Sequence, residues 1–137
     1  MSKQKCVMVL NETLPAGVQA NTSAVLAISL GQQNPEMVGY PLEDHSGEAR
    51  NAITTVAIPI LKSSAEQLSE LREMVKQHEP ELTVIDLISA SRTTRNYDEY
   101  AEQLKETPTD ELVYQGVALM GREKLIKRFT GNLPLLR

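Results

Sequence analysis

The chain has 137 residues, close to the commonest size of one domain, and this length is enough to bury about two-thirds of the unfolded surface. Its 18 acidic and 14 basic side chains give a net charge of -4. This sign disfavours nucleic acid as a partner, because nucleic-acid affinity comes mainly from cations that neutralise phosphates. We expect a single domain spanning residues 1–137.

No apolar run approaches the ~20 residues that span a bilayer, and the amino terminus lacks the pattern of a signal peptide. We therefore expect a cytoplasmic protein without a membrane partner. Cys6 is the only cysteine, so an internal disulfide and a thiolate zinc cluster are excluded. We expect its thiol to be buried and unreactive.

The first thirty residues predict a strand, a turn and a helix. The apolar run Cys6–Leu10 contains two valines and is typical of a strand covered on both faces. From Asn21 a nearly all-apolar stretch predicts a helix that is buried in the domain or in an interface and ends at Gly31. We expect a positive φ at Gly17 in the turn. Ligands of α/β folds often bind where a strand ends at a helix start, so the turn is a predicted site.

Residues 32–51 contain prolines, glycines and charged side chains, a composition typical of an exposed loop. About twenty residues is long for a loop in a compact domain, and such loops are often functional or mobile. The next segment, Ala52–Leu61, is rich in β-branched side chains and predicts a second strand. Pro59 places this strand at an edge of the sheet or ends it.

An amphipathic helix and a third strand follow. Ser63 and Glu66 have the spacing of a capping box, and apolar residues at helical spacing continue to His78. Leu82–Ile88 predicts the strand, which Asp86 interrupts. Because burial of a carboxylate is costly unless it is paired or reaches the sheet end, Asp86 is either a paired structural residue or a functional one.

The last third of the chain predicts two helices around a fourth strand. Asn96 and Glu99 mark a helix start, and Val113–Met120 predicts a strand that ends at Gly121. A short helix then closes at Gly131. The order βαβαβαβα predicts an α/β layered domain of about four strands.

Common catalytic motifs are missing from the sequence. There is no Gly-rich phosphate loop, dinucleotide fingerprint or Gly-x-Ser-x-Gly elbow, which disfavours ATPases, dinucleotide enzymes and serine hydrolases. We expect no cofactor and no metal, because the only histidines are His45 and His78. A cation at His78 suits the end of its helix. His45, beside Asp44, is either the better general-base candidate or a surface histidine without a role.

Several segments carry a resemblance to known families. Lys5–Ile28 resembles the amino-terminal motif of type II peptidyl-tRNA hydrolases, and Val117–Gly121 with Thr130–Leu133 resembles their closing strand and tail. The chain also contains the motif Asn-x-x-Leu-Pro-x-Gly-x-x-x-Asn at Asn11–Asn21 and the ending Leu-Pro-Leu-Leu-Arg at Leu133–Arg137. With these motifs it is similar, over nearly its full length, to the uncharacterised bacterial family DUF2000, which is built on that hydrolase fold. This resemblance implies a three-layer α/β/α sandwich on a four-stranded mixed sheet.

The residues that carry the hydrolase chemistry do not match in this chain. The resemblance implies that Pro15, Val18 and Ala20 stand where the hydrolases have lysines, and Ala27 where they have a histidine. Ser89 stands in place of the acid of their Asp-Ala-Gly-x-Thr segment. No nearby residue in the loop restores the lost cations, so we expect no efficient cleavage of peptidyl-tRNA.

Two functional hypotheses of different class remain. The favoured one is a small-ligand binding or regulatory domain that recognises an anionic or carbonyl-bearing molecule. Its predicted ligand-binding residues are Asn11, Gly17, Gln19, Asn21, Thr22 and Arg92. The alternative is a divergent hydrolase of an aminoacyl or peptidyl ester, with Asp44, His45 or Asp86 as acid or base and Arg92 holding an anion.

We also expect a homodimer whose pocket lies between residues 11–21 and 89–95. The first helix is too uniformly apolar to leave a face in water, and the apolar tail Leu133–Leu136 would otherwise fray. A symmetric dimer would cover both surfaces. Cover supplied within one subunit is the alternative.

Overall fold

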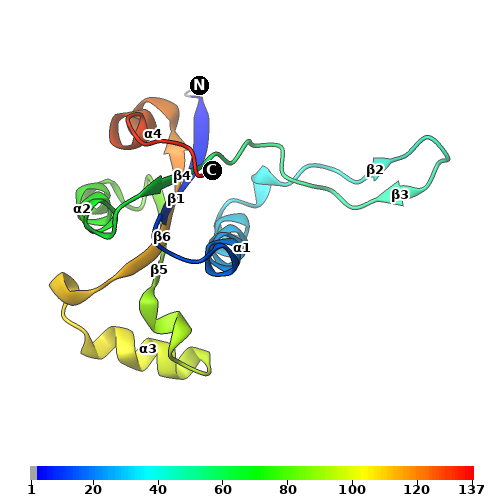
Figure 1. The fold of residues 1–137 in the computed structure, drawn as a ribbon. Coiled ribbons are helices and arrows are strands. Elements are labelled where there is room, and N and C mark those ends of the chain that lie inside the picture. The colour runs from blue at the N-terminus through cyan, green and yellow to red at the C-terminus, as the bar shows by residue number, and fades with distance from the viewer. Residues whose placement is uncertain (1–2) are drawn as a thin grey trace.

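A mixed four-stranded sheet in the order β4-β1-β6-β5 forms the centre of the computed structural model, which describes residues 3–137 (Figure 1). Its strands are β1 (Gln4–Asn11), β4 (Ile60–Ser63), β5 (Thr83–Ile88) and β6 (Tyr114–Arg122). The four α-helices are α1 (Ala16–Gln33), α2 (Ala65–Val75), α3 (Tyr97–Glu106) and α4 (Glu123–Thr130). Strand β1 is parallel to β4, and β6 is antiparallel to both β1 and β5. The predicted α/β class with a four-stranded mixed sheet is confirmed, but two short strands that the sequence analysis did not predict lie outside this sheet.

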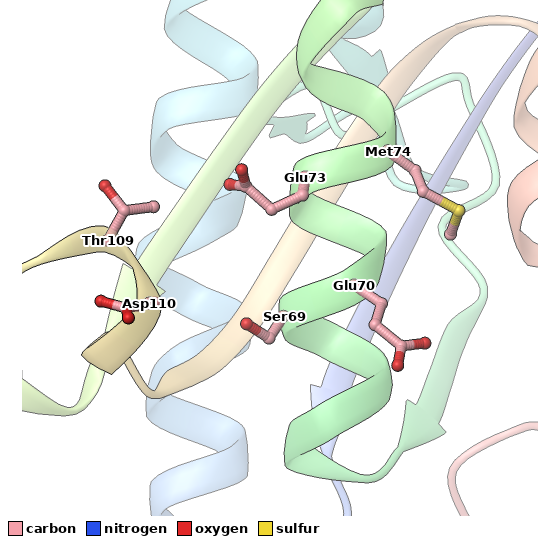
Figure 2. A pocket seen from close by; sticks show the side chains of 6 residues that line it. All are labelled: Ser69, Glu70, Glu73, Met74, Thr109 and Asp110. Carbon is pink, nitrogen blue, oxygen red and sulfur yellow. The ribbon is translucent and has the colours of Figure 1, made fainter.

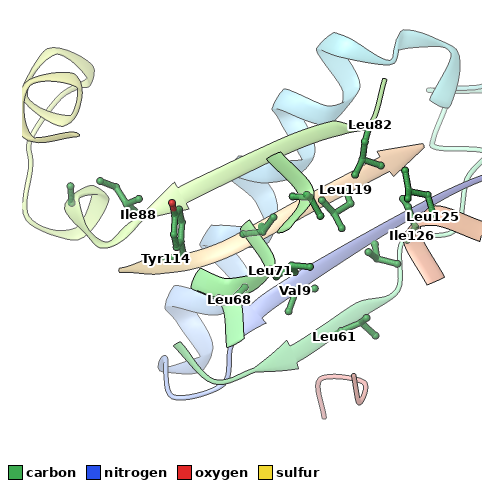
Figure 3. Packing of buried hydrophobic residues seen from close by; sticks show 14 residues of the cluster. Val9, Leu61, Leu68, Leu71, Leu82, Ile88, Tyr114, Leu119, Leu125 and Ile126 are labelled. Atoms are coloured by element: carbon green, nitrogen blue, oxygen red, sulfur yellow. The ribbon is translucent and has the colours of Figure 1, made fainter. Parts of the chain in front are cut away.

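Helices cover both faces of the sheet. Side chains alternate along β1, so Val7 and Val9 pack in the cluster beneath α2 and α4 (Figure 3), whereas Cys6 and Met8 pack in the cluster beneath α1. Helix α3 contributes no buried residue and lies beyond the end of the sheet (Figure 1). The expected burial of Cys6 is confirmed, since its side chain has no exposed surface.

The predicted second strand is wrong over most of its length. Only Ile60 and Leu61 of the segment Ala52–Leu61 belong to β4, which is an edge strand directly after Pro59. Residues 53–55 of this segment instead pair with residues 37–39 of the predicted loop, and Val56 and Ile58 pack against the cluster beneath α1. Their extended conformation follows from their side chains, but their partner is decided by the tertiary fold.

Residues 38–55 form a two-stranded ribbon, here termed the arm, which projects away from the sheet past α1 (Figure 1). It contains β2 (Leu42–Glu43) and β3 (Ala49–Arg50). The pairs Val38–Thr54 and Leu42–Arg50 keep one register along the ribbon. At its tip Gly47 has φ of 83°, the positive value that a tight turn requires. The predicted loop is therefore an ordered ribbon.

The expected positive φ at Gly17 is wrong. Gly17 lies in the first turn of α1, which begins at Ala16, and among the described glycines only Gly47 has a positive φ. The turn is closed without a left-handed residue, because the Asn11 carboxamide oxygen accepts hydrogen bonds from Thr13 N (3.0 Å) and Thr13 Oγ1 (2.8 Å).

Three predicted element ends are shifted. Helix α1 continues past Gly31 to Gln33, and β6 continues past Gly121 to Arg122, which pairs with Gln4 of β1. The capping box of α2 is formed by Ser64 and Gln67 rather than by Ser63 and Glu66; it joins Gln67 N to Ser64 Oγ (3.1 Å) and Ser64 N to Gln67 Oε1 (3.0 Å). These ends depend on tertiary pairing as well as on local sequence.

The apolar tail is held in place by its own subunit, although Leu135 stays 46% exposed. Lys62 N donates to Pro134 O (3.0 Å), and Leu136 N donates to Ile60 O (2.9 Å), so the tail pairs with the open edge of β4. The tail therefore does not need a second subunit to keep it from fraying. Among the described residues, no helix is both long and apolar enough to cross a bilayer.

Helix α1 is not buried on all sides by its own chain. Leu26 and Leu30 pack against the sheet, but the side chain of Ile28 is 75% exposed and that of Val25 is 37% exposed. The predicted full burial is thus wrong within a single subunit. The exposed side of α1 is still apolar, which leaves the argument for a dimer from this helix in place.

Candidate functional site

A pocket of about 350 Å³ lies between α1 and the segment that leads from β5 into α3. It is here termed the α1–α3 pocket, and its lining residues are Asn21, Val25, Leu87, Ser91, Thr94, Arg95, Asn96, Tyr97 and Tyr100. Strands β1 and β5 run in the same direction and both end at this side of the sheet, where α/β folds commonly bind ligands. The pocket therefore lies between Asn21 and residues of the segment 89–95.

The outer wall of the pocket is held by side-chain bonds at the start of α3. The short 3-10 helix η3 (Ser89–Arg92) leads from β5 toward α3, and Asn96 Oδ1 accepts from Glu99 N (2.9 Å), as predicted. Ile88 N donates to Tyr100 Oη (3.0 Å), beside an irregularity in the β5–β6 pairing. This hydrogen bond joins α3 to the end of β5. Burial raises the pKa of the Tyr100 phenol.

A buried polar chain connects three elements at the pocket wall. Ser91 Oγ donates to Gln115 Oε1 (3.1 Å), and Gln115 Nε2 donates to Thr22 Oγ1 (2.9 Å). Gln115 and Thr22 are almost completely buried, so the bond between them is shielded from water, whereas the bond from the half-buried Ser91 lies at the pocket. Sequence reasoning missed Gln115. The available signal was a polar side chain inside the apolar strand that the sequence predicted for this region.

Asn21 alone among the six predicted ligand-binding residues lines the pocket. Asn11 closes the β1–α1 turn, and Gln19 Nε2 donates to Asn11 O (3.4 Å), so both side chains hold the loop. Thr22 is buried against Gln115. Gly17 and Arg92 are exposed and lie outside the lining residues of the α1–α3 pocket. The cation that lines the pocket is Arg95, three residues after the predicted arginine.

Asp86 lies on the other face of the sheet from the pocket helix. It accepts from Arg72 Nε of α2 (2.7 Å), and Arg72 Nη1 also donates to Glu79 (2.9 Å). Burial alone would lower the pKa of the Arg72 guanidinium, but the bonds and charges of Asp86 and Glu79 outweigh it and raise that pKa. The structural alternative for Asp86, a paired carboxylate, is the arrangement observed.

Asp44 and His45 lie at the tip of the arm, far from the pocket of the same chain (Figure 1). Asp44 accepts from the backbone N–H of Glu48 (3.0 Å) and Ser46 (2.9 Å) and from Arg50. The bond from Glu48, followed by those from Arg50 and Ser46, lowers the pKa of the Asp44 carboxyl group. Among the described residues, the pocket lining includes no carboxylate and no imidazole.

A second hollow, of about 690 Å³, lies between α2 and the short helix η4 (Thr109–Glu111) (Figure 2). Figure 2 shows Glu73 pointing toward η4, whereas Glu70 and Met74 point away from Asp110. Within residues 3–137 no group of three histidine, cysteine or acidic side chains could hold a metal ion. The α1–α3 pocket is the better candidate site, because it combines one cation, amides and hydroxyl groups with apolar surface.

Comparison with known proteins places the chain in a family. Residues 4–137 match the model of a family described as protein of unknown function, DUF2000. No curated protein matches the chain. The solved structure of a protein of unknown function from Agrobacterium tumefaciens strain C58 has the same fold, with a TM-score of 0.89, 20% sequence identity and 98% of each chain covered. Since the family model covers nearly the whole sequence, the chain belongs to the DUF2000 family.

Proposed function

We propose that the protein is a small-ligand binding or regulatory domain whose ligand occupies the α1–α3 pocket. Arg95 supports this proposal, since it lines the pocket and has no ion-pair partner among the described residues. Asn21 and Asn96 add carboxamide groups, and Leu87 adds apolar surface. A few polar groups on an apolar lining suit a ligand with an anionic or carbonyl group on a flat or apolar body.

The observation that carries the proposal is the buried chain of Ser91, Gln115 and Thr22. A buried amide that is hydrogen-bonded at both ends holds its neighbours in one arrangement. Because Ser91 donates its proton to Gln115, its oxygen is left as an acceptor for the pocket. The ligand class therefore has an anionic group for Arg95 and a hydrogen-bond donor for Ser91.

We also propose that the protein is a cytoplasmic homodimer and that its fold is a three-layer α/β/α sandwich similar to that of type II peptidyl-tRNA hydrolases. The exposed apolar side of α1 supports the dimer. The hydrolase alternative lacks a supporting observation, because the pocket lining carries no general base and the lysines of the hydrolase motif do not match.

The proposal is tested by a thermal-shift screen against nucleotides, aminoacyl analogues, short peptides and aromatic carboxylates, followed by titration calorimetry of the hits. We expect Arg95→Gln to weaken binding of an anionic hit about tenfold or more, because it removes a charge-assisted hydrogen bond. Arg128→Gln is the matched control, since this exposed arginine of α4 lies on the opposite face of the sheet from the pocket, and it should leave the affinity within about twofold. Equal effects of the two variants would contradict the proposed site.

A further inference from the structure

The arm carries an exposed apolar stripe. Its register is continuous from Val38–Thr54 to Leu42–Arg50, so alternation places Val38, Tyr40 and Leu42 on one side of the ribbon. Their side chains are 50%, 78% and 44% exposed. A two-stranded ribbon without a covered face is marginally stable in water at best. The stripe therefore needs a surface that its own chain does not supply.

A matching surface lies on the same side of the sheet. The outer face of α1 exposes Ala24, Val25 and Ile28, and the arm projects from the sheet on this side (Figure 1). The two apolar surfaces belong to neighbouring segments, because the arm begins just after the carboxyl end of α1. A partner that packs on α1 is thus within reach of the arm.

We propose that this partner is a second copy of the chain, with the two α1 helices packed antiparallel about a two-fold axis and each arm lying along the other subunit. In this arrangement the root of one arm lies beside the amino end of the second α1. Eight residues from Val38 to His45 reach about 25 Å, whereas packed helices lie only about 8–10 Å apart. An arm that points away from its own sheet (Figure 1) therefore passes the second α1, and its tip lies toward the end of the second sheet, where the pocket is.

Charge favours the antiparallel arrangement over a parallel one. Glu43 and Glu48 at the arm tip, like Arg92 and Arg95 beside the pocket, have no ion-pair partner within residues 3–137. An antiparallel pair brings the acidic tip to these arginines. A parallel pair would bring it to the carboxyl end of α1, where the last turn has no basic residue and Glu36 follows.

The arm then completes the pocket of the other subunit. Arg92 of the second copy pairs with the acidic tip, Arg95 remains for the ligand, and His45 reaches the pocket mouth, which has no imidazole of its own. This role of His45 rests on the ligand site proposed above, whereas the dimer does not. The dimer is therefore tested without a ligand, by mass and self-association, so its failure is distinct from failure of the ligand site.

The first experiment measures mass in solution by light scattering at tens of micromolar. We expect the parent chain at twice its 15.2 kDa and the variant Tyr40→Ser/Leu42→Ser at the monomer mass with unchanged circular dichroism, because both side chains are exposed. Met74→Ser is the control, since Met74 is a 48% exposed apolar side chain on α2, across the sheet from α1, and it should remain dimeric. A monomeric parent, or a double variant that stays dimeric, would overturn the proposal.

The second experiment is a charge exchange. Arg92→Glu should raise the dissociation constant of the dimer about tenfold, and adding Glu48→Arg should restore it to within about threefold. Arg128→Glu on α4 is the control and should have no effect, because α4 covers the opposite face. Failure of Arg92→Glu to weaken the dimer, or of Glu48→Arg to restore it, would reject the antiparallel arrangement.

Discussion

The two faces of the central sheet are covered in different ways. One face is closed by α2 and α4 over an apolar cluster that includes Leu68, Leu119 and Ile126, each with no exposed surface (Figure 3). The other face is covered by α1, by Met37 after its end and by flanking segments that include Ile58, and the outer side of α1 exposes Val25 and Ile28. The arm and the α1–α3 pocket both lie on the α1 side. The first face is therefore complete within one chain, and the second is the face where we propose that ligand and partner bind.

Deletion of core atoms on the closed face should have the largest effect. Leu119→Ala should lower the free energy of unfolding by about 2–5 kcal/mol, because it leaves a cavity in a packed cluster. Ile28→Ala on the open face should change it by less than about 0.5 kcal/mol. Urea unfolding at a concentration where the chain is monomeric measures both. Similar losses for the two variants would contradict the difference between the faces.

Adding a side chain at Gly116 of β6 should disrupt the packing of α1 on the sheet. A Cβ at Gly116 would lie 2.8 Å from Leu10 Cδ2 and 2.9 Å from Thr22 Cγ2, so Gly116→Val should cost about 1–3 kcal/mol of stability. A Cβ at Gly17 would meet no atom within 4 Å. Gly17→Ala should therefore stabilise the helix by up to about 1 kcal/mol. Thermal unfolding that ranks these two variants in reverse order would show that α1 does not pack closely on β6.

Loss of the buried hydrogen bond between Gln115 and Thr22 at the pocket wall should lower the stability of the protein. Gln115→Leu leaves the buried Thr22 hydroxyl without its donor and should cost about 1–3 kcal/mol. Replacing both partners, as Gln115→Leu/Thr22→Val, should recover part of this loss. A double-mutant cycle by urea unfolding measures the coupling. Strictly additive effects would mean that the Gln115–Thr22 bond contributes nothing.

The smallest expected effect concerns Cys6, which lies beneath α1. Burial raises the pKa of its thiol from 9.0 to about 11, so the folded chain keeps a proton that the unfolded chain loses. Its contribution to stability is complete below pH 9 and is lost as the pH rises toward 11, by about 1 kcal/mol between pH 9 and pH 10. Burial also raises the pKa values of the half-buried Tyr100 and the buried Tyr114.

The urea midpoint is measured at pH 8, 9 and 10 for the parent and for Cys6→Ala. Because both proteins contain the tyrosines, the difference between them gives the loss of stability that is due to the thiol. A parent whose decline between pH 9 and pH 10 is no steeper than that of Cys6→Ala would show that water reaches the thiol beneath α1. This result would also contradict our view that the outer side of α1 is exposed to water whereas its inner side excludes water.

Local sequence determined the elements whose signals lie within a few residues. The apolar run of β1, the Asn96–Glu99 start of α3 and the end of α4 at Gly131 follow from burial pattern and capping alone. The pairing of Asp86 was also foreseeable, because a partly buried carboxylate in a strand needs a partner. Such features need no knowledge of distant parts of the chain.

Tertiary structure alone decided the features that join distant segments. The arm depends on pairing between residues on either side of its turn, and the Gln115–Thr22 bond joins residues 93 positions apart. The choice of Arg95 over Arg92 as the pocket cation depends on how η3 leads into α3. Spacing in a sequence reports periodicity and caps but not which side chains meet across a sheet, because that is set by strand order and packing.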